Sequence, residues 1–119
     1  MPFEDGHFDA AYELEATVHS PDLDAIYSEL FRVLKPGGHF AGYAWAMTDK
    51  YDPENAEHKK IKYGIEIGNG LPPMHTKEEI LIAMKKAGLK IIEGEIIFLL
   101  FFLFFFHIFF YNFFSIYLL

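Results

Sequence analysis

Apolar and polar residues alternate near the start of the chain. The apolar members of this pattern are Phe8, Ala10, Tyr12 and Leu14. A period of two is typical of a strand with one buried face, so a strand is predicted here. Tyr12 and Leu14 would then point to one side of the sheet, and Glu13 and Glu15 to the other.

A helical repeat follows this strand. Ser20 is a typical N-cap residue, and Pro21 suits the first turn of a helix. Apolar residues then recur at helical spacing at Leu23, Ile26, Tyr27, Leu30, Val33 and Leu34. The sequence Pro36-Gly37-Gly38 is predicted to end the helix.

The middle of the chain begins with a run of small and aromatic residues. His39 to Met47 is predicted to be a strand that is buried on both faces, as in a parallel sheet covered by helices. Residues 48–56 are polar and predict a loop, and residues 57–67 predict a short helix. Residues 68–73 contain too many glycines and prolines for regular structure.

A last helix is marked by a capping box, formed by Thr76 and Glu79. Its apolar stripe consists of Ile80, Leu81, Met84 and Ala87, and Gly88 closes it. A third strand is predicted to begin over residues 89–92. Strands that alternate with helices indicate an α/β fold, here the C-terminal half of a doubly wound Rossmann-like sheet.

The last 24 residues, 96–119, contain no Asp, Glu, Lys or Arg, and ten of them are Phe. As a helix they would span about 36 Å, enough to cross a hydrocarbon core of about 30 Å. Low-charge aromatic runs also favour β-aggregation. The sequence therefore predicts two parts, a partial domain over residues 1–95 and a hydrophobic tail over residues 96–119. The tail is a transmembrane segment, the product of a misread or truncated gene, or a packed element of the core.

The composition of the chain argues against several classes of partner and site. The net charge is −7, and residues 1–31 hold eight acidic residues and no Lys or Arg, which argues against a nucleic-acid partner. The chain has no Cys, so disulfides and thiolate metal sites are excluded. Its six His residues lack the spacing of metal ligands, so no metal site is predicted. This composition suits a reducing, intracellular compartment.

Three separated segments resemble one family in sequence and in order. They are Tyr12 to Pro21 (YELEATVHSP), Met47 to Asp52 (MTDKYD) and Glu66 to Pro72 (EIGNGLP). They resemble the sterol 24-C-methyltransferases, which are class I S-adenosylmethionine-dependent methyltransferases, and the resemblance runs from Met1 to about Glu95. It implies methyl transfer from S-adenosylmethionine to carbon 24 of a sterol side chain. A sterol substrate and a location at the endoplasmic reticulum or another membrane are implied with it.

The resemblance also implies which residues act. Methylation of an alkene leaves a carbocation, which needs aromatic rings or carboxylates nearby and a base that removes a proton. By resemblance, Glu15, His19 and Tyr12 are the candidate catalytic residues. From the residues alone, Glu15 is equally a helix-capping or structural carboxylate, and a core tyrosine is favoured over a site residue for Tyr12.

Three further residues are candidates for sterol binding by the same resemblance: Tyr43, Trp45 and Glu66. Between the first two the family usually has Glu, and this chain has Ala44, which removes one carboxylate. The family's usual Cys before the His is Val18 here. Glu66 is equally a solvated residue of a turn.

Cofactor binding in this fold uses a Gly-rich loop after the first strand and an acidic residue after the second. Neither Gly37-Gly38 nor the glycines of residues 68–70 stand between a first strand and the following helix. The chain is therefore predicted to be an incomplete copy that does not bind S-adenosylmethionine by itself. Two alternatives stay open: another class I methyltransferase of small molecules or lipids, and a non-catalytic, membrane-attached remnant.

Overall fold

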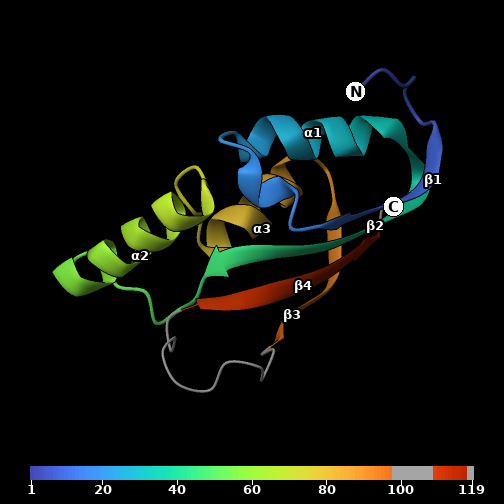
Figure 1. Cartoon of the computed structure of the whole chain (residues 1–119). Helices are drawn as coiled ribbons and strands as arrows, with labels where there is room; N and C mark the ends of the chain where they lie inside the picture. Colours follow the sequence, from blue (N-terminus) through green and yellow to red (C-terminus); the bar gives the residue numbers. More distant parts are fainter. Residues whose placement is uncertain (98–108, 118–119) are drawn as a thin grey trace.

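The computed structural model describes residues 1–97 and 109–117, which form one sheet with helices (Figure 1). In chain order the elements are β1 (Phe8–Leu14), the 3-10 helix η1 (Thr17–His19), α1 (Leu23–Val33), β2 (Leu34–Met47), α2 (Ala56–Asn69), α3 (Lys77–Lys86), β3 (Lys90–Ile97) and β4 (Phe109–Tyr117). The strand order is β1-β2-β4-β3, with β1 parallel to β2 and β4 antiparallel to both of its neighbours. The predicted α/β class is confirmed, but the described sheet is mixed and has four strands.

β4 lies inside the uncharged run of residues 96–119. It pairs with β2 from His39 opposite Tyr117 to Met47 opposite Phe109. On its other edge it pairs with β3. This part of the run is therefore a sheet strand and not a membrane-spanning helix. Residues 98–108 and 118–119, where the predicted membrane segment continues, lie outside the described residues. Across the described part of the chain, no helix has the length and hydrophobicity to cross a membrane.

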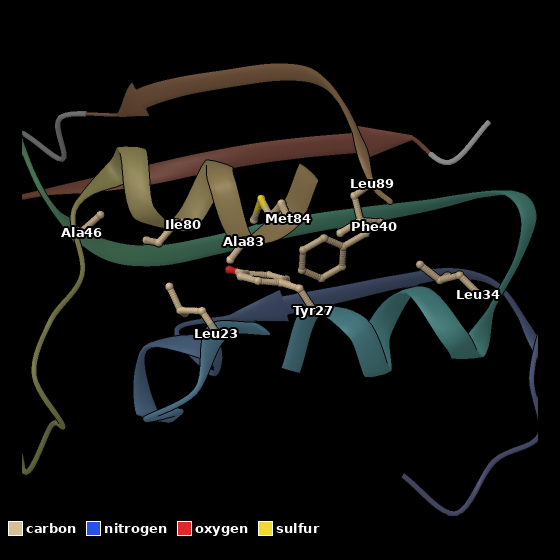
Figure 2. Packing of buried hydrophobic residues seen from close by; sticks show 9 residues of the cluster. All are labelled: Leu23, Tyr27, Leu34, Phe40, Ala46, Ile80, Ala83, Met84 and Leu89. Atoms are coloured by element: carbon tan, nitrogen blue, oxygen red, sulfur yellow. The ribbon is translucent and has the colours of Figure 1, made fainter. Parts of the chain in front are cut away.

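The hydrophobic core lies between the sheet and helices α1 and α3, as Figure 2 shows. At its centre the rings of Tyr27 and Phe40 pack edge to face, with centroids 6.4 Å apart. Both side chains are fully buried. The other members of the cluster are Leu23, Leu34, Ala46, Ile80, Ala83, Met84 and Leu89. The helical spacing read from the sequence therefore identified the inward faces of α1 and α3 correctly.

Helix α1 begins and ends differently from the prediction. Its N-cap is Asp22, whose Oδ1 accepts a hydrogen bond from the N–H of Ala25 at 2.9 Å. Ser20, the predicted cap, instead donates its hydroxyl to the carbonyl of Asp22 at 2.9 Å. At the other end the helix stops at Val33, and the Pro-Gly-Gly sequence of residues 36–38 falls within the irregular start of β2.

Helices α2 and α3 follow the sequence more closely. The capping box of α3 is confirmed, because Thr76 and Glu79 exchange both of its hydrogen bonds. α2 is longer than predicted, since Gly68 and Asn69 still belong to the helix. Gly70 then caps it with a φ of 63°, a left-handed conformation that glycine adopts without strain.

An irregularity in the pairing of β1 with β2 accompanies a change in which residues of β1 share a face. Phe8 lies opposite Leu34 but Ala10 lies opposite His39, so the extra residues are on β2. Phe8 packs against the core, whereas Tyr12 and Leu14 lie 78% and 71% exposed. The single face predicted for the four alternating residues is therefore wrong. β2 was predicted to be buried on both faces, but Tyr43 is only half-buried.

Candidate functional site

The carboxyl ends of parallel strands are where ligands bind in sheets of this kind. Here the ends of β1 and β2 meet, because Leu14 is in register with Tyr43. The N–H of Glu15 donates to the carbonyl of Tyr43 at 2.5 Å. The turn over residues 15–19 is thereby fixed beside the end of β2.

The Glu13 carboxylate shapes this turn. Its Oε2 accepts hydrogen bonds from the backbone N–H groups of Ala16 and Thr17, each at 2.8 Å. Its Oε1 accepts the hydroxyl of Thr17, also at 2.8 Å. These N–H groups belong to the start of η1, which has no cap from its own N-cap residue, Ala16. Glu13, the penultimate residue of strand β1, therefore caps the 3-10 helix.

Glu15 carries backbone strain at this edge. Its φ is +56°, and among the described residues it is the one non-glycine residue with positive φ. The left-handed region costs an L-residue roughly 1–2 kcal/mol, and such strain gathers at functional sites. The Glu13 cap on one side and the bond to Tyr43 on the other hold Glu15 in this conformation.

The cap continues into the core through Thr17 and Tyr27. Thr17 is buried, and the Tyr27 hydroxyl donates to Thr17 Oγ1 at 3.5 Å. Burial raises the pKa of the Tyr27 phenol to about 12, because the phenolate would lose its hydration. The nearby negative charge of Glu13 acts in the same direction.

Tyr27 should therefore ionise late in an alkaline titration. Its folded-state pKa lies above the unfolded value of about 10, so its contribution to stability is present below pH 10 and is lost as the pH rises through about 12. Phenolate absorbance should show a late step that is absent in Tyr27→Phe. If Tyr27→Phe leaves the titration curve unchanged, the buried phenol does not titrate separately.

A small indentation lies where three segments meet at this edge. Residues from η1, from the end of β2 and from the segment before α3 line it, together with one residue each from α1 and α3: Thr17, Val18, Leu23, Ala44, Trp45, Met74, His75 and Ile80. The N–H of Met47 donates to the His75 carbonyl at 2.8 Å, which fastens the third segment to β2. The walls are mostly apolar and include one indole ring, but the hollow is much smaller than a small-molecule site.

Glu66 holds the third segment from the other side. It is almost fully buried on α2, and its Oε1 accepts the N–H of Met74 at 2.6 Å. The same oxygen pairs with the Lys62 ammonium one turn earlier in the helix. Glu66 therefore positions Met74 at the indentation, and its role as a direct ligand of substrate stays a prediction.

The predicted residues divide into two groups. Glu15, Tyr43 and Trp45 come together at the carboxyl edge of β1 and β2. His19 ends η1 at the same edge and is exposed. Tyr12 lies on the open face of β1, so it is not a core tyrosine, and it does not line the indentation. Catalytic roles for these residues stay predictions.

The sequence reasoning missed Glu13 and Thr17. A carboxylate directly before a turn, followed three and four residues later by N–H groups without helical partners, is the signal that could have identified the cap. Met74 and His75 were missed because the sequence does not indicate which strand they approach.

The described residues do not form a complete cradle for S-adenosylmethionine. The segment between parallel β1 and α1, residues 15–22, contains no glycine that would let the backbone approach a cofactor closely. Gly37 lies within β2, and Gly70 caps α2. Among the described residues, the segment between β1 and α1 is therefore not a Gly-rich loop of the kind that binds this cofactor.

Comparison with known proteins bears on the fold and the family. Residues 1–42 match the family model described as a methyltransferase domain. The chain is 56% identical over 91 residues to the sterol 24-C-methyltransferase of Debaryomyces hansenii, covering 76% of this chain and 24% of that protein. It is 54% identical over 92 residues to the cycloartenol-C-24-methyltransferase of Arabidopsis thaliana, covering 77% of this chain and 27% of that protein. The resemblance to sterol 24-C-methyltransferases is confirmed.

The chain spans about a quarter of the length of these curated relatives. Among solved structures, geranyl diphosphate C-methyltransferase from Streptomyces coelicolor matches with a TM-score of 0.78 at 17% identity, covering 100% of this chain and 49% of that chain. That enzyme was solved with S-adenosyl-L-homocysteine bound. At this identity the match shows the fold, and the relatives' sequences show the family resemblance.

Proposed function

We propose that the chain carries the substrate-side wall of a sterol 24-C-methyltransferase, which transfers a methyl group from S-adenosylmethionine to a sterol alkene. The observation that carries the proposal is the hydrogen bond from Glu15 to Tyr43 at the carboxyl edge, two residues before Trp45, which lines the indentation. These residues lie within or beside the segments that resemble the family. S-adenosylmethionine supplies the methyl group when bound, and the chain's own residues act on the sterol.

The charge that develops on the sterol explains the residue types. When a new carbon–carbon bond forms at one alkene carbon, the positive charge appears on the other, and loss of a proton restores a neutral product. The half-buried Glu15 carboxylate and the ring of Trp45 supply negative charge and a π face at this edge. Among the residues of this edge, we propose His19 and Glu15 as the groups that accept the proton.

A chimera tests this proposal directly. The 91 aligned residues of this chain would replace the matching segment of the Debaryomyces hansenii relative. We expect 24-methylated sterol, detected by mass spectrometry, at a rate within about tenfold of the parent enzyme. A chimera that folds, as judged by circular dichroism, but yields no product would contradict the proposal and favour a non-catalytic remnant. Methylation of other lipids in place of sterols would favour another class I methyltransferase.

The isolated chain should bind S-adenosylmethionine poorly, because the described residues lack a close-approach glycine between β1 and α1. Isothermal titration is the measurement. We expect a dissociation constant weaker than roughly 100 μM, which corresponds to about −5.5 kcal/mol. A tighter constant would show that this chain alone supplies enough of the cofactor site.

The proposed substrate also implies that the protein acts at a membrane. Sterols partition into lipid bilayers, so the proposed substrate is met at a membrane, and the endoplasmic reticulum is the compartment that the family resemblance implies. Residues 96–119 contain no charged side chains, and this composition favours contact with a lipid bilayer.

A further inference from the structure

His75 and Glu79 form an imidazole–carboxylate pair beside the indentation. His75 Nδ1 lies 3.7 Å from Oε2 of Glu79, which stands in the first turn of α3. The His75 side chain lines the indentation together with Trp45, and 29% of it is exposed. The imidazole is therefore accessible at the carboxyl edge, and one of its two nitrogens faces a carboxylate.

The backbone around His75 fixes where this ring lies. Its carbonyl accepts the N–H of Met47 at 2.8 Å, and Met47 also forms a parallel bridge with Thr76. On the other side, Glu66 holds the N–H of Met74. Figure 1 shows the start of α3 beside the end of β2. These bonds use backbone atoms of the segment and leave the imidazole of His75 for another role.

The Glu79 carboxylate is held in place by the capping box of α3. Its Oε2 accepts the N–H of Thr76 at 2.7 Å and the hydroxyl of Thr76 at 3.1 Å. The bond from the Thr76 N–H, above all, keeps the pKa of Glu79 below its usual value, and nearby His75 acts in the same direction. Glu79 therefore presents a negative charge to the imidazole, which favours its protonated form.

The other charged groups near this pair lie on α2. Lys62 also lowers the pKa of Glu79, and its ammonium pairs with Glu66. The remaining side chains that line the indentation, from η1, α1, β2 and α3, carry no charge. Among the described ion pairs, Glu79 is the carboxylate that faces His75.

We infer that His75 is a further catalytic residue, which accepts the proton lost by the sterol cation, and that Glu79 is its positioning residue. The inference rests on the proposed function and adds a third proton acceptor to His19 and Glu15. Because Nδ1 faces Glu79, the lone pair of Nε2 is the one that accepts the proton. The hollow itself is too small for a ligand, so the sterol side chain would lie across its mouth.

The proton transfer is balanced without a further reactant. A C–H bond next to the cationic carbon breaks, and its electron pair forms the new double bond of the sterol. The proton bonds to Nε2 of His75, and the resulting imidazolium is stabilised by the Glu79 carboxylate. Since the His75 side chain is partly exposed, the imidazolium can then release the proton to water.

His75→Asn in the active chimera tests the catalytic role. An amide cannot accept the proton, and a general base contributes roughly 10²–10⁴-fold to the rate, so turnover should fall about tenfold or more. The backbone bonds of residue 75 are kept, and circular dichroism would verify the fold. His7→Asn is the matched control, because the exposed His7 precedes β1 at the opposite end of the strand, and turnover should not change.

Glu79→Gln separates the charge of the pair from its structural role. Glutamine also completes a capping box, so the variant keeps the start of α3 and loses the negative charge beside His75. Turnover of the parent chimera should decline on the acidic side, where the base is protonated. In Glu79→Gln this decline should move to lower pH, because the neutral imidazole persists further. Glu78→Gln, at the exposed neighbouring carboxylate, should leave the decline where it is.

Two results would overturn the inference while the proposed function stands. One is an active chimera in which His75→Asn keeps full turnover, which would assign His75 to structure alone. The other is an acidic decline at the same pH in Glu79→Gln as in the parent chimera, which would show that the pair does not govern the base. A parent chimera that folds but makes no methylated sterol would instead defeat both the proposed function and this inference.

Discussion

Replacing Glu13 with alanine is expected to lower the free energy of unfolding by about 3 kcal/mol, at about 1 kcal/mol for each of three lost hydrogen bonds. Thr17 is buried, so its N–H and hydroxyl would be left without these acceptors. Urea denaturation followed by circular dichroism measures the change.

Two variants show whether this loss belongs to the cap. Glu13→Gln keeps one oxygen that can accept hydrogen bonds, so its loss should lie between that of alanine and the wild type. Glu78→Ala removes an exposed carboxylate from the first turn of α3 and should change stability by less than about 0.5 kcal/mol. If Glu13→Ala is no more destabilising than Glu78→Ala, the cap does not hold the turn.

Glu15 should be needed for turnover although its backbone is strained. In the active chimera, Glu15→Gln keeps the size of the side chain but removes the charge that would stabilise the sterol cation. We expect turnover to fall at least tenfold, which corresponds to about 1.4 kcal/mol or more. Sterol methylation at saturating substrate is the measurement.

Glu15→Gly separates strain from chemistry. Glycine adopts the φ of +56° freely, so this variant should be more stable by about 1 kcal/mol while turnover falls as far as in Glu15→Gln. Unchanged turnover in both variants would reassign Glu15 to a structural role. If Glu15→Gly is more stable but has lost turnover, the strained backbone at residue 15 serves to position the Glu15 carboxylate.

Local patterns predicted the helices because their signals lie within a few residues. The capping box of Thr76 and Glu79 and the stripe through Ile80 and Met84 need no tertiary context. The start of α1 was misplaced because both Ser20 and Asp22 are good N-caps. The hydroxyl of Ser20 bonds to Asp22 instead, which leaves the Asp22 side chain to cap the helix.

The site was only partly predictable, because its geometry depends on contacts between distant segments. The family resemblance pointed to the turn after β1, where Glu15 lies. It did not show that Glu13 caps this turn or that Glu66 reaches Met74. The irregular pairing near Phe8 and Ala10 was also not predictable, and beyond it Tyr12 lies on the exposed face of β1.

The position of β4 has a consequence for how the protein is made. β4 is the last described element to leave the ribosome, yet it lies between β2 and β3. Until β4 is synthesised, one edge of β2 and one edge of β3 have no strand to pair with among the described elements. The sheet therefore cannot assemble progressively during translation, and the nascent chain exposes two open edges until a Phe-rich segment inserts between them. Yield of this protein should depend on chaperones that shield such edges during synthesis.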